Sequence, residues 1–369
     1  MHIHLRSFVL RIFIIFSLIF GILGLSCFAI THTLAMWIKQ FKQIRLGYLD
    51  LLVKYSLEIE LASILFVLLS LVGIMVISSR YKVLKINLAL AIGSISIILL
   101  GTYAVLCLFI YLNLDEVLNR NNVIFQPHKA ERVLSEAILQ STLYGNVEEL
   151  NITTPDNVIL NGWLLKNSVS EKSPLIIYFG GSAEEVSDIL LQAKQLRGWS
   201  VALINYRGFG LSEGSPNQEN VFNDSTYIYD YLMKRSDIDS ERIVSMGYSL
   251  GTGVAINLSS KRATKGTVLV APYHNRSDKI RDLFHLPYFP MSMILKQPFN
   301  SISVAPKIMT PLLCLVGDED KNIPNESSMK LVKKWGGKTT TKTFKAADHF
   351  FLFTNNDAWV EINSFLLDI

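Results

Sequence analysis

Residues 242–262 of the chain read RIVSMGYSLGTGVAINLSSKR. The stretch begins with a short apolar run that predicts a buried strand, and its second half has the spacing of a helix with small side chains. Between them lies Gly247-Tyr248-Ser249-Leu250-Gly251, the G-x-S-x-G pattern of a nucleophilic serine on a sharp strand-to-helix turn. The two glycines avoid side-chain collisions in that turn, and the helix N-terminus favours developing negative charge. We therefore expect Ser249 to be a nucleophile.

A serine needs a base to remove its proton and an acid to orient that base. On a turn of this type the acid and then the histidine follow the serine along the chain. Three candidate acids, Asp318, Glu319 and Asp320, come directly after an apolar strand, and spacing alone leaves the choice among them open. His349 follows the acids, whereas His274 and His285 precede them. We therefore expect His349 to be the base.

The oxyanion of an acyl-transfer intermediate needs two backbone N–H donors. One comes from the residue after the nucleophile, and the other from the loop after an early strand. Leu250 provides the first. The loop Gly180-Gly181-Ser182-Ala183 ends an apolar strand, and we expect the second donor to be the N–H of Ser182.

Short apolar strands alternate with amphipathic helices on both sides of the turn. Expected strands are 147–153, 158–165, 175–179, 200–206, 242–247, 266–271 and 312–317, and expected helices are 184–197, 221–235 and 249–262. The first two strands flank Pro155-Asp156-Asn157, as in an antiparallel hairpin. The rest predicts an α/β fold with a mostly parallel sheet covered on both faces.

The N-terminal third of the chain is different. Three runs without Asp, Glu, Lys or Arg, residues 12–38, 61–79 and 86–114, are long enough to cross a bilayer, which needs roughly 20 apolar residues. We expect a membrane region over 1–115 and a linker over 116–142. The chain would then be a multi-pass integral membrane protein, in the inner membrane if bacterial, in contact with membrane lipids. The basic cluster at 80–85 weakly favours an extracytoplasmic domain over 143–369.

Composition excludes several classes of protein. Half of the residues are hydrophobic and 18% are charged, which excludes disorder. The basic excess lies in the first 140 residues, at the membrane flanks, so the net charge of +4 does not indicate nucleic acid binding. Three cysteines in apolar runs do not make a disulfide scaffold. Because the chain has no phosphate loop and no zinc-type Cys/His spacing, we expect no metal and no organic cofactor.

From about residue 147 onward the sequence resembles the α/β-hydrolase superfamily, specifically its membrane-anchored serine-hydrolase branch. Four ordered motifs carry the resemblance: NYRGFGLSEGSP at 205–216, GYSLG at 247–251, GDEDKNIP at 317–324 and ADH at 347–349. The resemblance implies the α/β-hydrolase fold and places the acid at Asp320. It also implies that residues 272–306, rich in bulky apolar side chains, form a lid over the nucleophile. In one respect the chain departs from the family pattern, because Gly180-Gly181-Ser182 replaces the usual His-Gly-Asn of the oxyanion loop.

These features together predict a membrane-bound serine hydrolase. It would cleave an ester, thioester or amide bond, peptides included, through Ser249, His349 and Asp320, with a small-molecule or lipid-like acyl substrate favoured. Two alternatives stay open. The chain could be a membrane-tethered binding or scaffold module that retains the fold without turnover, which the departure at Gly180 favours. It could also be an acyltransferase, because an alcohol or thiol can replace water at the same acyl-enzyme.

Overall fold

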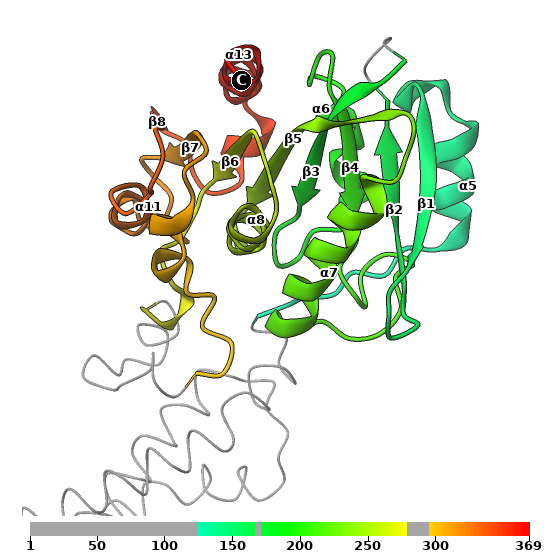
Figure 1. The fold of residues 1–369 in the computed structure, drawn as a ribbon, viewed down its shortest axis with the longest axis horizontal. Coiled ribbons are helices and arrows are strands. Elements are labelled where there is room, and N and C mark those ends of the chain that lie inside the picture. The colour runs from blue at the N-terminus through cyan, green and yellow to red at the C-terminus, as the bar shows by residue number, and fades with distance from the viewer. Residues whose placement is uncertain (1–123, 167–170, 279–294) are drawn as a thin grey trace, which may run out of the picture. The chain divides into compact units, whose positions relative to one another are not determined.

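Eight strands form one sheet in the computed structural model, in the order β1-β2-β4-β3-β5-β6-β7-β8 (Figure 1). The structure describes residues 124–166, 171–278 and 295–369. The strands are β1 (Val147–Thr153), β2 (Ile159–Leu165), β3 (Ser173–Phe179), β4 (Ser200–Ile204), β5 (Ile238–Tyr248), β6 (Gly266–Val270), β7 (Leu312–Gly317) and β8 (Thr339–Phe344). Strand β2 is antiparallel to both of its neighbours, and every pair from β4 to β8 is parallel. This is the hairpin and the mostly parallel sheet that the sequence predicts.

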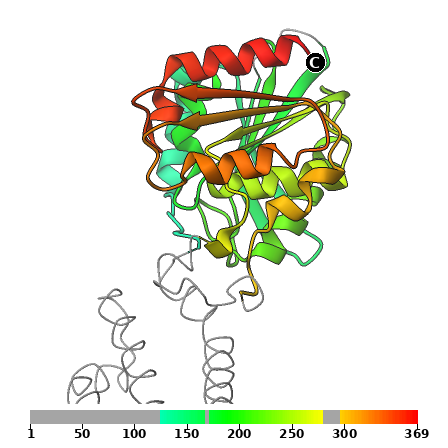
Figure 2. The same cartoon turned by 90° about the vertical axis from the view of Figure 1, so that its left-hand side faces the viewer.

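Helices cover both faces of the sheet. They are α5 (Arg132–Gln140), α6 (Leu190–Ala193), α7 (Gln218–Leu232), α8 (Leu250–Lys261), α11 (Asn325–Val332), α12 (Phe351–Thr354) and α13 (Asn356–Leu367). Figure 2 shows the sheet between α13 on one side and α8 and α11 on the other. Strands β3, β4, β6 and β7 are buried along their whole length, as expected for parallel strands covered on both faces.

The expected helix over 184–197 is wrong as a single element. The segment instead forms a 3-10 turn, η2 (Val186–Ile189), followed by the short helix α6. The side chain of Asn205 accepts a hydrogen bond from the Val186 N–H, and the side chain of Glu185 accepts one from the Ser187 N–H. These two hydrogen bonds hold the start of the segment in the η2 turn.

Two expectations concern residues that the structure does not describe. The predicted spans 12–38, 61–79 and 86–114 lie outside the described residues, as do 279–294 of the expected lid. Among the residues that the structure does describe, no helix is long and apolar enough to cross a membrane. The second compact unit of the chain runs from Leu118 to Ile369, and residues 132–140 of the expected linker form α5, which packs on β1.

Candidate active site

Ser249 lies at the turn between β5 and α8 with φ of 50° and ψ of −114°. A positive φ is uncommon for a residue with a side chain and has to be held by its surroundings. The Ser249 N–H donates to the carbonyl of Val270 on β6 at 3.0 Å. The Ser249 carbonyl accepts from the N–H of Thr252 at 3.1 Å and from its hydroxyl at 2.6 Å. The backbone of the proposed nucleophile is therefore fixed on both sides.

The glycines of the turn are required by close approach of backbones. A Cβ atom on Gly247 would lie 2.3 Å from the carbonyl oxygen of Gly251. A Cβ atom on Gly251 would lie 2.0 Å from the carbonyl oxygen of Phe179, at the end of β3. Neither distance is compatible with a side chain, so the two glycines allow α8 to begin directly against the sheet.

The structure brings Ser249, His349 and Asp320 together. The Oγ of Ser249 lies 2.9 Å from Nε2 of His349, and Nδ1 of the same ring lies 2.7 Å from Oδ2 of Asp320. The other carboxylate oxygen of Asp320 accepts the N–H groups of Asn322 and Ile323, both at 2.8 Å. The carboxylate is buried and held on both oxygens, so it can fix the orientation of the imidazole.

The other candidates are placed elsewhere. Asp318 and Glu319 are exposed, whereas Asp320 is 7% exposed. His274 contacts Ser327 through Nδ1 at 2.8 Å and Asp278 through Nε2 at 2.7 Å, and it makes no recorded hydrogen bond to Ser249. His285 lies outside the described residues. Cys314 is buried in β7, and burial raises the pKa of its thiol to about 12, so this thiol is not a nucleophile at neutral pH.

Tyr248 holds the His349 segment against the sheet. Its hydroxyl donates to the His349 carbonyl at 3.0 Å, and the two rings lie 5.3 Å apart between centroids. Phe350 packs edge-on against the imidazole, with the ring centroids 5.7 Å apart. The imidazole thus contacts two aromatic side chains and has a hydrogen-bond partner at each nitrogen.

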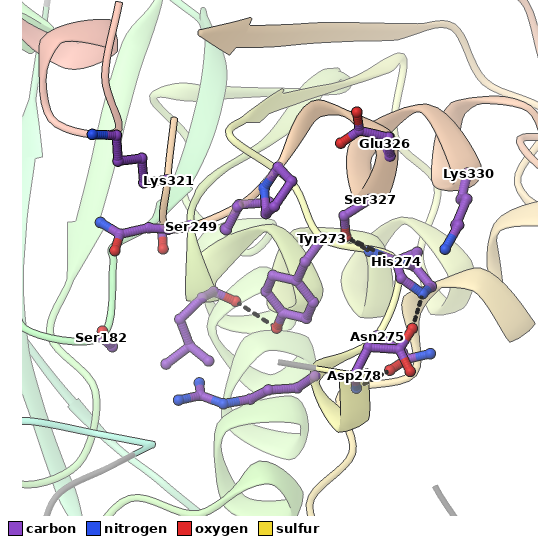
Figure 3. A pocket seen from close by; sticks show the side chains of 15 residues that line it. Ser182, Ser249, Tyr273, His274, Asn275, Asp278, Lys321, Glu326, Ser327 and Lys330 are labelled. Atoms are coloured by element: carbon purple, nitrogen blue, oxygen red, sulfur yellow. Dashed lines mark hydrogen bonds and ion pairs between the residues drawn. The ribbon is translucent and has the colours of Figure 1, made fainter. Parts of the chain in front are cut away.

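The two expected oxyanion donors share one pocket with the serine. Ser182, Ser249 and Leu250 all line a cavity of about 440 Å³ (Figure 3). Leu250 is the first residue of α8, where backbone N–H groups have no partner within the helix. In the portion of the chain that is described, no hydrogen bond is recorded from the N–H of Ser182 or Leu250.

The NYRGFG motif has a structural role beside this pocket. Arg207 is buried and forms ion pairs with Asp224 on α7 at 2.7 Å and with Asp156 at 2.6 Å. The Tyr206 hydroxyl donates to the Gly180 carbonyl at 2.9 Å. The motif therefore fixes α7 and one end of the loop after β3.

Sequence reasoning missed Glu184, which lies under that loop. Its carboxylate accepts from the Tyr178 hydroxyl at 2.7 Å and from the Gly181 N–H at 3.1 Å. The residue is only half-buried, but protein atoms enclose its carboxyl group, and this loss of hydration raises the pKa to about 7. An acid soon after a Gly-Gly-Ser turn looks like an ordinary first-turn residue of a helix, so the sequence carries no signal for this contact.

The raised pKa predicts how Glu184 affects stability. The native state holds the proton more tightly than the unfolded chain, so the contribution of this group is present below about pH 4.5 and is lost as pH rises through about 7. We expect Glu184→Gln, which cannot ionise, to gain about 2 kcal/mol relative to wild type between pH 5 and pH 8. Melting temperatures of both proteins in detergent at the two pH values measure this. A constant difference would contradict the assignment.

The chain is similar in sequence to several known proteins. Residues 210–364 match the model of the Dienelactone hydrolase family. An uncharacterised protein of Mycobacterium tuberculosis is 29% identical over 49% of this chain and 64% of its own length, so the chain spans just under two thirds of that relative. The Alpha/beta hydrolase domain-containing protein WAV2 of Arabidopsis thaliana is 27% identical over 53% of this chain and 69% of its own.

Two further similarities concern proteins with a stated activity. The Lysophosphatidylserine lipase ABHD12 of Danio rerio is 28% identical over 45% of this chain and 48% of its own length. Among solved structures, a Pyrococcus furiosus esterase superposes with a TM-score of 0.53 at 19% identity and covers 66% of this chain and 98% of its own. At that identity the structural likeness concerns the fold.

Proposed function

We propose that the chain, which is similar in sequence to α/β-hydrolase proteins, is a serine hydrolase that cleaves an ester, thioester or amide bond through an acyl-enzyme. The observation that carries the proposal is the continuous hydrogen-bonded series from Ser249 through His349 to Asp320. A serine, a base and an acid in contact with one another are what an activated hydroxyl nucleophile requires.

The proposed mechanism assigns one role to each group. Ser249 attacks the substrate carbonyl while His349 takes its proton through Nε2 and then gives it to the leaving group. Asp320 accepts the Nδ1 proton, orients the ring and stabilises its positive charge. The N–H groups of Leu250 and Ser182 stabilise the oxyanion. Water, activated by the same imidazole, then hydrolyses the acyl-enzyme and restores the hydroxyl. No metal or cofactor takes part in these steps.

For the substrate we propose a lipid-like acyl compound. Phe350 and Phe351, directly after the proposed base, are 70% and 46% exposed, so two large apolar side chains lie at the surface next to His349 in the sequence. The predicted apolar lid and membrane segments favour the same class of substrate, as does the lipase name of one relative. Attachment to a membrane is part of this proposal.

Hydrolysis of p-nitrophenyl esters tests the acyl preference. We expect kcat/KM for octanoyl or decanoyl esters to exceed that for acetyl by roughly 10-fold or more, because each buried methylene contributes about 0.8 kcal/mol. The measurement uses the full chain solubilised in detergent, and every ester is kept below its own critical micelle concentration. Ser249→Ala serves as the blank. Equal rates for all chain lengths, or a preference for acetyl, would remove the lipid-like substrate from the proposal.

A further inference from the structure

The Gly181–Ser182 peptide carries the N–H that the proposed mechanism directs at the oxyanion, and Glu184 holds Gly181 from two sides. Its side chain accepts the Gly181 N–H at 3.1 Å, and its backbone N–H donates to the Gly181 carbonyl at 3.4 Å. That carbonyl belongs to the same peptide plane as the Ser182 N–H. Glycine has the widest backbone freedom of all residues, so a fixed direction of this plane has to come from its contacts.

The carboxyl group is itself anchored to the sheet. Its second oxygen accepts the hydroxyl of Tyr178, a fully buried residue of β3. The loop is therefore linked through one carboxylate to a rigid strand that also ends beside the nucleophile. Two further hydrogen bonds hold the loop. The Tyr206 hydroxyl donates to the Gly180 carbonyl, and the Gln126 N–H donates to the Ser182 carbonyl.

A side chain at either glycine of the loop would be tightly packed. A Cβ atom on Gly180 would lie 3.3 Å from the carboxyl group of Glu184, and one on Gly181 would lie 3.2 Å from the ring of Tyr248. A side chain at position 180 would therefore begin directly beside Glu184 and would require it to shift by a few tenths of an ångström. The glycine at 180 and the acid at 184 fit together as one arrangement.

We propose that Glu184 is a positioning residue for the oxyanion hole, which fixes the Gly181–Ser182 peptide so that its N–H points at the developing negative charge. The inference rests on the proposed function. It also accounts for how the loop keeps its shape with Gly180-Gly181-Ser182 in place of His-Gly-Asn.

Substitutions of matched size test the role. Glu184→Leu keeps the volume but cannot accept the Gly181 N–H, so we expect kcat to fall roughly 10- to 100-fold, approaching the loss of an oxyanion donor, with KM within about 3-fold. Glu184→Gln can accept the Gly181 N–H through its amide oxygen and donate to Tyr178, and we expect it to keep kcat within about 3-fold of wild type. Asp188→Asn, an exposed acid of the same segment, is the control and should match wild type.

The design separates positioning from stability. Active serine is titrated with a fluorophosphonate in each preparation, so that kcat refers to folded protein, and melting temperatures are recorded alongside. Tyr178→Phe removes the hydroxyl that donates to Glu184 and introduces no charge, so it is the second test if the leucine variant does not fold. For this variant we expect a smaller fall in kcat, roughly 3- to 10-fold, again with KM little changed.

Three outcomes are decisive. A selective fall in kcat for the leucine and phenylalanine variants, with recovery in the glutamine variant, supports the proposal. Wild-type kcat in both Glu184→Leu and Tyr178→Phe, or an equal loss in the leucine and glutamine variants, would overturn it. If wild-type protein neither hydrolyses esters nor reacts with the fluorophosphonate, the proposed function fails first, and that result is distinct from the other two.

Discussion

Replacing Ser249 by alanine is expected to lower kcat/KM for ester hydrolysis by about 10⁴-fold or more. The hydroxyl is the attacking atom of the mechanism, and in serine enzymes the residual rate without it comes from oxyanion binding alone. The substitution removes one oxygen from a fixed turn, so the fold should be kept. Initial rates on a p-nitrophenyl ester measure the effect, with the melting temperature as a check on folding.

Ser327 is the matched control for this prediction. It lines the same pocket and also contacts a histidine, since its Oγ lies 2.8 Å from Nδ1 of His274, whose Nε2 lies 2.7 Å from Asp278. Figure 3 shows this second group of serine, histidine and acid in the pocket. Ser327 lies within α11 and lacks the strand-to-helix turn of Ser249, so Ser327→Ala should change the rate less than 10-fold. A large loss in Ser327→Ala with an active Ser249→Ala would show that the nucleophile is misassigned.

Asp320→Asn is expected to lower kcat by roughly 10³- to 10⁴-fold, the scale known for the corresponding change in another serine hydrolase. The reason lies in the contacts of the carboxylate. Oδ1 accepts two backbone N–H groups, so the asparagine must place its own oxygen there. Its NH₂ group then faces Nδ1 of His349, which forces the ring proton onto Nε2. In that tautomer the ring cannot accept the proton of Ser249.

The exposed neighbour Asp318 provides the comparison. Asp318→Asn removes the same charge two residues away without touching the imidazole, and it should stay within about 2-fold of wild type. Comparing kcat for the two variants separates tautomer control from a general loss of negative charge. Equal rates for both asparagine variants would contradict the role given to Asp320.

Sequence patterns predict the elements that are buried and apolar. Strands β1 and β7 have the bounds expected from their patterns. A short alternating or wholly apolar run between turn residues is typical of a strand. The order of serine, acid and histidine likewise predicts which side chains meet, since the carboxyl ends of parallel strands lie at one edge of the sheet. The choice of Asp320 over its neighbours came from a family motif and not from spacing.

The features that sequence reasoning misses depend on tertiary contacts. Strand β8, TTTKTF, is partly exposed and contains a single large apolar residue. It therefore has no apolar run from which a strand could be predicted. The turn before α6 is bound by the side chain of Asn205, which directly follows β4. Glu184 gains its role only from Tyr178 and Gly181, which the fold brings to it. None of these contacts follows from local periodicity or propensity.

The central claim, an activated nucleophile at Ser249, is tested most directly by covalent labelling. Detergent-solubilised full-length protein would be treated with a fluorophosphonate probe, and the adduct located by peptide mass spectrometry. We predict a single adduct on Ser249 in wild type and its loss in His349→Ala, where the serine remains but its base is gone. An adduct on another residue, undiminished labelling of His349→Ala, or no labelling of folded wild-type protein would contradict the account.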